Sequence, residues 1–75
     1  MRSEYMPLVM APCNREMEVR KIAAEDKTKK HLMELGIVAG CRITLLSSGE
    51  RGVIVAVKEG RLCLDGELAR KILVA

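Results

Sequence analysis

Polar and apolar positions alternate along much of the chain, and this period of two predicts β-strands. Residues 17–20 alternate apolar and charged side chains, and residues 40–45 place every second side chain, beginning with Cys41, on one face. Both stretches therefore predict half-buried strands. The break in the alternation at residues 21–22 predicts a bulge or a strand end.

The second half of the chain continues as strands joined by short polar connections. Residues 53–57 are a nearly continuous β-branched run, which is typical of a central strand. A polar, glycine-flanked connection is predicted over residues 47–52, and a tight turn over residues 58–60. Residues 61–64 then return antiparallel with both leucines inward, and residues 72–74 form a last short strand.

The N-terminal segment, residues 6–12, is apolar but contains Pro7 and Pro12. Each proline removes a backbone donor, so we expect an extended arm or an edge segment here and not a central strand. A turn at Asn14 and Arg15 follows. Two accounts of the arm stay open: it folds back over the core as the first strand, or it adds to the sheet edge of another chain, in a homodimer or on a partner.

One helix is predicted over about residues 26–35. Asp26 can cap its N-terminus, and Gly36 follows the helix directly and suits the left-handed conformation that ends helices. A helix this short is not stable alone, so its apolar face must pack on the sheet. That face consists of Thr28, Leu32 and Leu35. A short helical turn is predicted near residues 67–71.

Several short strands, tight connections and one helix in so few residues predict a mainly-β domain that closes into a small barrel. Closure would remove the exposed strand edges that a very small β protein cannot tolerate. The chain has 75 residues and a mass of 8.3 kDa, which leaves room for a single domain over residues 1–75.

Aromatic side chains make up 1% of the sequence, and Tyr5 alone supplies them. Recognition of proline-rich peptides and base stacking on single-stranded nucleic acid both need aromatic platforms, so these functions are excluded. The net charge of +3 provides no large field of one sign, so nucleic acid is not an expected partner. The core must be aliphatic.

The cysteines and the N-terminus indicate the compartment. Cys13, Cys41 and Cys63 are odd in number and form no CxxC pair, which favours free thiols in a reducing cytoplasm. The N-terminus lacks the apolar core of a signal peptide, and the longest apolar run is too short to span a bilayer. We therefore expect a soluble cytoplasmic protein that does not insert into the membrane.

Two parts of the chain resemble the signature of the FeoA family. The first is HLMELGIVAG at residues 31–40 with the following strand that contains Ile43, and the second is LCL at residues 62–64 followed by ELARKI at residues 67–72. The similarity runs from about Leu8 to the C-terminus. It implies an SH3-like β-barrel and an accessory or regulatory role in bacterial ferrous iron uptake, exerted by binding the cytoplasmic part of FeoB, the GTPase-linked membrane transporter.

The chain departs from the family pattern at two places. Ala39 stands where the family usually has proline, so we expect a more mobile loop. Lys30 and His31 stand where arginine is commoner in the family. The guanidinium group of arginine, which can form two parallel hydrogen bonds, is thereby replaced by a point charge. The same barrel also occurs at the C-terminus of iron-dependent repressors, so a metal-responsive regulatory module is the alternative function. The absence of a helix-turn-helix in the sequence favours the accessory protein.

A metal site and catalysis both lack support from residue spacing. One histidine and three scattered thiols do not converge on Fe(II) or another divalent metal, so no cofactor is expected. An iron-binding chaperone that uses Cys13 or Cys63 stays a further alternative. His31 has no nucleophile at a fixed short spacing, and the glycine segment at residues 36–40 lacks the Lys-Ser/Thr of a phosphate-binding loop. No enzymatic activity is therefore expected.

Two features are candidates for partner binding: the basic cluster of the helix, extended by Arg20 and Lys21, and the apolar arm. Exposed lysines are ordinary on a solvated helix face, but they can also dock onto an acidic surface of a protein partner. Methionines in the arm adapt to irregular surfaces. Recognition would then use aliphatic, methionine-rich and basic surface. The candidate residues are Tyr5 and Met10 in the arm and Lys27, Lys29, Lys30 and His31 on the helix.

Overall fold

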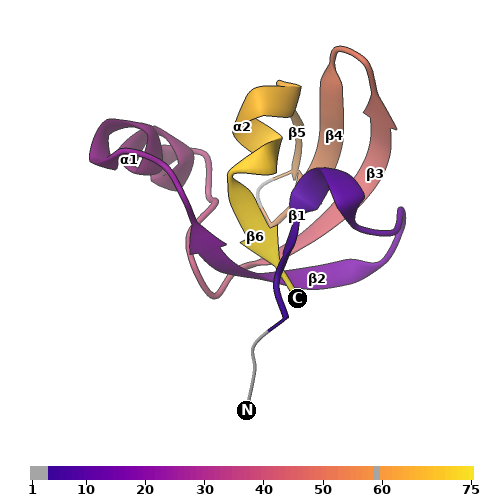
Figure 1. The fold of residues 1–75 in the computed structure, drawn as a ribbon, viewed down its shortest axis with the longest axis horizontal. Coiled ribbons are helices and arrows are strands. Elements are labelled where there is room, and N and C mark those ends of the chain that lie inside the picture. Colours follow the sequence, from indigo (N-terminus) through magenta and orange to yellow (C-terminus); the bar gives the residue numbers. More distant parts are fainter. Residues whose placement is uncertain (1–3, 59) are drawn as a thin grey trace.

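The structure is a computed structural model that describes residues 4–58 and 60–75. The described part of the chain forms six strands and three helical elements, and α1 stands to one side of the strands (Figure 1). In chain order they are β1 (Met6–Pro7), the 3₁₀ helix η1 (Leu8–Met10), β2 (Glu16–Ile22), α1 (Asp26–Glu34), β3 (Arg42–Gly49), β4 (Gly52–Val57), β5 (Gly60–Leu64), α2 (Gly66–Arg70) and β6 (Ile72–Val74).

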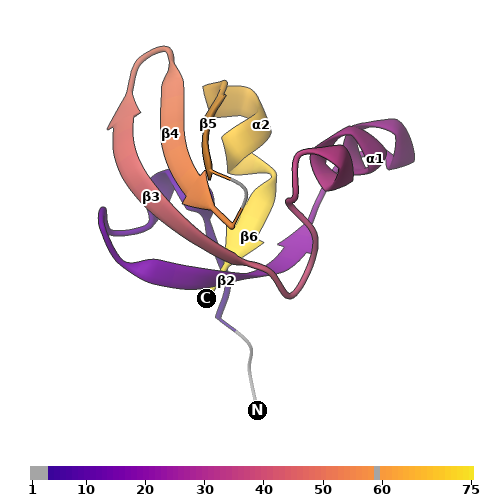
Figure 2. The same cartoon turned by 180° about the vertical axis from the view of Figure 1, so that it is seen from behind.

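The strands form one antiparallel sheet in the order β1-β6-β2-β3-β4-β5. The sheet is strongly curved, and β2 and β3 sweep across the molecule in both views (Figures 1 and 2). Among the described residues no ladder joins β5 to β1, so the prediction of a closed barrel is wrong. Short helical elements cover the core on this side instead, because α2 contacts both β4 and η1.

The core is wholly aliphatic, as the composition requires. Strands supply most of it, and each helical element adds a side chain: Leu8 from η1, Leu32 from α1 and Ala69 from α2 are fully buried. Burying such side chains is the main source of stability in a domain this small. The largest fully buried side chains are Leu8, Val19, Leu32, Ile37, Ile43, Leu45, Val55, Ile72 and Val74.

The arm is an edge segment, as predicted, but part of it is helical. Met6 and Pro7 pair with the end of β6, which leaves Pro7 in a two-residue edge strand where its missing N–H is harmless. The 3₁₀ helix that follows was not expected; it turns the chain so that Leu8 is buried under the sheet. The arm therefore folds back over the core of its own chain.

The helix α1 confirms the predicted apolar face and corrects the predicted cap. Leu32 is fully buried, and Thr28 and Leu35 beside it are half-buried. Gly36 has φ 92°, the left-handed conformation expected after a helix. The N-cap is Glu25 and not Asp26, because Glu25 has extended backbone angles and Asp26 is already helical; no side chain caps this end.

The hairpin of β3 and β4 is longer than the sequence pattern predicts. The segment 47–52 was expected to be a connection, but the ladder continues to the pair Gly49 and Gly52, which leaves a two-residue turn. Ser47 and Ser48 are exposed because the hairpin extends beyond the core, where strands need no apolar face. The predicted turn at 58–60 includes Glu59, which lies outside the described residues; Val57 and Gly60 pair on either side of it.

Candidate protein-docking groove

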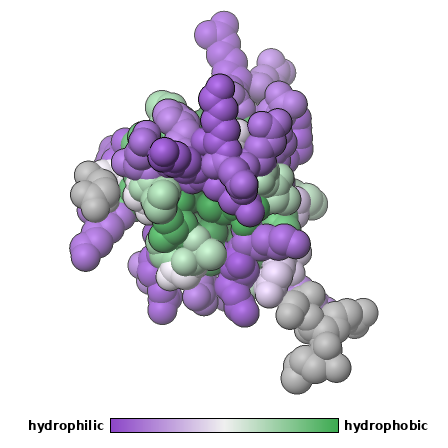
Figure 3. All heavy atoms as spheres, turned by 90° about the vertical axis from the view of Figure 1, so that its left-hand side faces the viewer, coloured by the Kyte–Doolittle hydropathy of each residue, from purple (hydrophilic) through white to green (hydrophobic). Residues whose placement is uncertain are grey.

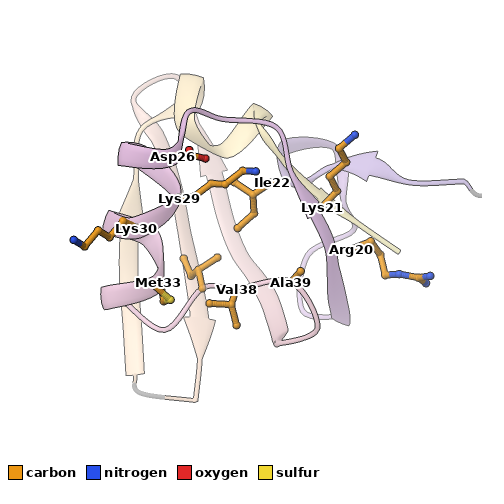
Figure 4. Close-up of a pocket in the computed structure, with 10 residues that line it drawn as sticks. Arg20, Lys21, Ile22, Asp26, Lys29, Lys30, Met33, Val38 and Ala39 are labelled. Carbon is orange, nitrogen blue, oxygen red and sulfur yellow. The ribbon is translucent and has the colours of Figure 1, made fainter.

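A hollow of about 510 Å³ lies between α1 and β2, and we refer to it as the α1–β2 groove. Its walls are one face of α1 and the end of β2, and residues 37–39 of the following loop also line it; Val38 and Ala39 lie in its lower part in the view of Figure 4. Beyond Glu18, β2 no longer pairs with β3 in the ladder but with β6. This divergence leaves one side of β2 open to α1, and the hollow forms there.

Two local features place side chains around the groove. Asp26, Lys29, Lys30 and Met33 recur at positions i, i+3, i+4 and i+7, which lie on one face of a helix. On the opposite wall, the register of β2 against β6 shifts between Val19 and Lys21, so the usual alternation of buried and exposed residues is interrupted. The exposed side chains of Arg20 and Lys21 therefore stand next to each other.

The centre of the groove is apolar. Ile37 is fully buried and Ile22 is 8% exposed, so these two residues belong to the core and also line the groove. Met33 and Val38 also line the groove, and they are 55% and 39% exposed. The face of the molecule that carries α1 shows this apolar patch enclosed by hydrophilic side chains (Figure 3). The groove thus leaves large apolar side chains in water beside the core.

The rim of the groove is basic. Arg20 and Lys21 on β2 and Lys29 and Lys30 on α1 line it. In the view of Figure 4, Lys29 extends from α1 toward Ile22, whereas Lys30 extends from α1 to the side away from β2. Among the residues that the structure describes, Asp26 is the one carboxylate that lines the groove. Within residues 4–58 and 60–75 the three lysines form no ion pair with a carboxylate, so their charges are available to a ligand.

The structure separates the predicted site residues into groups. Lys29 and Lys30 line the groove, whereas Lys27 and His31 lie on other faces of α1. His31 lines a different, more polar hollow toward α2. Tyr5 is 38% exposed and does not line the groove itself. It contacts a residue that does, because the guanidinium of Arg20 lies 5.2 Å from the centroid of the Tyr5 ring.

Met10 is 71% exposed on η1 and does not line the groove. Sequence reasoning did not single out Met33 and Val38, which supply the exposed apolar centre. The helical spacing of Lys29, Lys30 and Met33 was a signal that could have identified Met33. Val38 has no such signal, because its position depends on how the loop after α1 packs.

The described residues contain no group of three or more His, Cys, Asp or Glu side chains that could hold a metal ion. Cys13 and Cys63 are exposed and Cys41 is half-buried, and all three are free thiols. The expectation of a protein without a cofactor stays a prediction. No helix in the described part of the chain has the length and apolar character needed to cross a membrane.

A strongly curved antiparallel sheet with short helical elements packed beside it defines a small domain of the SH3-like fold class, and similar solved structures support this class. Over residues 6–75 the chain matches the family model of the FeoA domain. The chain therefore belongs to the FeoA family, as its resemblance in sequence indicated. Among curated protein sequences, none matches it.

Two FeoA structures are similar over most of their length. A crystal structure of an iron uptake regulatory protein (FeoA) has 22% identity and a TM-score of 0.85, with 97% of each chain covered. The solution structure of the FeoA protein from Chlorobium tepidum has 28% identity and a TM-score of 0.80, with 92% of this chain and 68% of that chain covered. In both cases the similarity extends over nearly all of this chain and is not limited to one motif.

A third similar structure is a manganese-dependent transcriptional repressor, with 19% identity and a TM-score of 0.88. The comparison covers 100% of this chain and 43% of the repressor. The fold of this protein therefore also occurs as one part of a larger regulator.

Proposed function

We propose that this protein is a non-enzymatic accessory protein of ferrous iron uptake that acts in the cytoplasm by binding the cytoplasmic part of the FeoB transporter. The observation that carries the proposal is the match of the FeoA family model over residues 6–75. A similar structure is described as an iron uptake regulatory protein, which supports a regulatory role for this chain as well.

The α1–β2 groove supports the binding role. Exposed apolar side chains gain free energy when a partner covers them, since each square ångström of apolar surface removed from water contributes about 25 cal/mol. The groove offers Met33 and Val38 for this purpose. Its lysines, which form no ion pair within the described residues, would speed the encounter with a partner surface of opposite charge.

A titration of the protein against the purified cytoplasmic domain of the transporter tests the proposal. Isothermal calorimetry at physiological salt, with the domain nucleotide-free, GDP-bound and bound to a non-hydrolysable GTP analogue, should give a saturable one-to-one complex in at least one state. Absence of binding in all three states would contradict the proposed function. Unchanged nucleotide hydrolysis in a saturated complex would restrict the role to recruitment.

A second candidate is a metal-responsive regulatory module that supports transcription control. It is favoured by the similarity to a manganese-dependent repressor at a TM-score of 0.88. A mobility-shift assay with promoter DNA, with and without Fe(II) or Mn(II), separates the two functions, because only this candidate requires the protein in a complex with DNA.

A further inference from the structure

We propose that the α1–β2 groove binds an acidic segment of a partner protein in which one or two bulky apolar side chains lie between carboxylates. The inference uses the proposed function only for the identity of the partner; the chemistry of the bound segment follows from the groove itself.

The positive charge of the rim favours a ligand with negatively charged groups. Of the described residues, four basic side chains and a single carboxylate line the groove, although the whole chain carries 13 basic and 10 acidic residues. The groove is therefore much more basic than the average of the chain. A carboxylate between Lys21 and Lys29 would gain a charge-assisted hydrogen bond without breaking an ion pair within the described residues.

The apolar centre of the groove favours a ligand with a bulky apolar side chain. Ile22 and Ile37 form a rigid floor because they are packed into the core, whereas Met33 and Val38 are exposed enough to adjust around an incoming side chain. Binding sites commonly place a few apolar anchors in a central pocket inside a polar rim. A leucine, isoleucine or phenylalanine side chain fits this description.

The concave shape favours a protein segment over a membrane. Proteins that bind bilayers through side chains insert protruding apolar residues below the headgroups. Here the apolar residues line a hollow of about 510 Å³, and two of them, Ile22 and Ile37, are buried. A flat headgroup layer would leave this hollow unfilled, whereas an apolar side chain of a protein segment can enter it.

A peptide titration followed by NMR tests the chemistry of the ligand directly. The probe is a synthetic peptide with two leucines flanked on each side by two glutamates, and its control has lysines in place of the glutamates. The acidic peptide should shift the amide signals of Ile22, Lys30 and Val38 and leave Ile54 unchanged, with weaker binding at high salt. Equal binding of both peptides, or shifts centred on Ile54, would overturn the proposal.

Matched variants locate the site. The double variant Lys29→Glu/Lys30→Glu should bind the acidic peptide about tenfold or more weakly. Lys58→Glu/Lys71→Glu makes the same change in net charge at exposed lysines outside the groove and should stay within about twofold of the unaltered protein. Equal losses in both double variants would mean attraction by net charge alone and would overturn the proposal.

The apolar contact has its own pair of variants. Val38 and Ile54 are both 39% exposed. Val38→Thr exchanges a methyl group for a hydroxyl and Ile54→Thr exchanges an ethyl group for a hydroxyl, so both place a hydroxyl at a position of equal exposure. Val38→Thr should weaken peptide binding about fivefold, since the hydroxyl would be desolvated on binding. Ile54→Thr should leave the affinity unchanged. No loss in Val38→Thr would contradict an apolar anchor in the groove. Matching circular dichroism melts show that the variants are folded.

The same variants distinguish this inference from the proposed function. If the transporter domain binds the unaltered protein and Lys29→Glu/Lys30→Glu equally well, the groove is not the docking site and the inference fails while the proposed function stands. If the domain does not bind but the acidic peptide shifts the groove signals, the proposed function fails and the inference stands. Binding to phosphatidylglycerol vesicles that requires Lys29 and Lys30, without any response to the peptide, would assign the groove to lipid and overturn the inference.

Discussion

Two hollows of similar size lie on different sides of this small domain, and they differ in what surrounds their apolar residues. The α1–β2 groove has a volume of about 510 Å³, and the described residues that line it include four basic side chains and one carboxylate. The second hollow, which we call the hairpin hollow, lies between the β3–β4 turn and the end of β5 and has about 450 Å³. Arg51 lines it together with two acidic side chains, Glu50 and Asp65. Size does not distinguish the hollows, but charge does.

The two hollows also differ in how they are built. One wall of the α1–β2 groove is a helix that stands off the sheet and is anchored to the core through Leu32. The hairpin hollow is made of strands whose backbones approach closely, since a Cβ atom on Gly52 would lie 2.3 Å from the carbonyl oxygen of Leu64. Exposed residues of α1 that line the groove can be substituted without changing the sheet. Residues that line the hairpin hollow belong to the strands, so substitutions there also affect the sheet.

The largest expected effect removes the anchor of the groove wall. Leu32→Ala should lower the free energy of unfolding by about 2–5 kcal/mol, because it leaves a cavity at a fully buried position. Met33→Ala is the control: Met33 follows Leu32 in the sequence but is 55% exposed, so truncating its side chain should change stability by no more than about 0.5 kcal/mol. Urea denaturation followed by circular dichroism measures both, and equal effects would mean that α1 is not anchored through Leu32.

The next effect concerns the backbone of the hairpin hollow. Gly52 has φ 146°, so Gly52→Ala should cost about 1–3 kcal/mol from conformation alone and more from the contact with the Leu64 carbonyl. Gly49 pairs with Gly52 across the hairpin and has open space around it, so Gly49→Ala should change stability by no more than about 0.5 kcal/mol. Thermal melts of the two variants compare them; similar melting temperatures would contradict the close approach of β4 and β5.

A smaller effect is expected where the hairpin hollow meets α2. The side chain of Asp65 accepts a hydrogen bond of 2.7 Å from the backbone N–H of Leu68 and caps α2. Asp65→Ala should destabilise the protein by about 1 kcal/mol, whereas Asp65→Asn keeps an acceptor and should retain most of the stability. Chemical denaturation checks the difference. If both variants lose the same stability, the charge of Asp65 and not its capping bond is responsible.

The smallest effect concerns the rim of the groove. Arg20 lies 5.2 Å from the centroid of the Tyr5 ring, a contact that contributes about 0.5–1 kcal/mol at an exposed site. Tyr5→Ala should therefore lower stability by no more than this amount and weaken binding of the acidic peptide about twofold, because Arg20 is no longer held at the rim. Tyr5→Phe keeps the ring and should behave like the unaltered protein. A larger loss in Tyr5→Phe would point to the hydroxyl group instead.

Much of the secondary structure could be predicted because short-range periodicity reports which face of an element is buried. Residues 17–20 and 61–64 alternate and are strands, and Leu32 at helical spacing marks the inner face of α1. The prediction was wrong where an element extends beyond the core. Ser47 and Ser48 are polar in succession although they lie in β3, because no apolar face is needed at the tip of a hairpin.

The candidate site was predicted only in part. Lys29 and Lys30 were named because positive charge on a short helix is visible in the sequence, but Lys27 and His31 were named with them on the same evidence. Only the direction in which α1 faces β2 separates the first two from the others. The exposed Val38 could not be predicted, because its exposure depends on the path of a loop.

The sequence by itself determined four properties of this protein. They are an aliphatic core, the order of the strands and of one helix along the chain, a family signature, and the lack of an aromatic platform beyond Tyr5. These properties follow from composition and from contacts between near neighbours. The tertiary structure alone decided that the sheet stays open between β5 and β1 within the described residues, and that Ile22, Met33 and Val38 meet in one groove with a basic rim. Such features depend on how β2 leaves β3 and where α1 then packs, and no local pattern encodes the packing of elements that are distant in the chain.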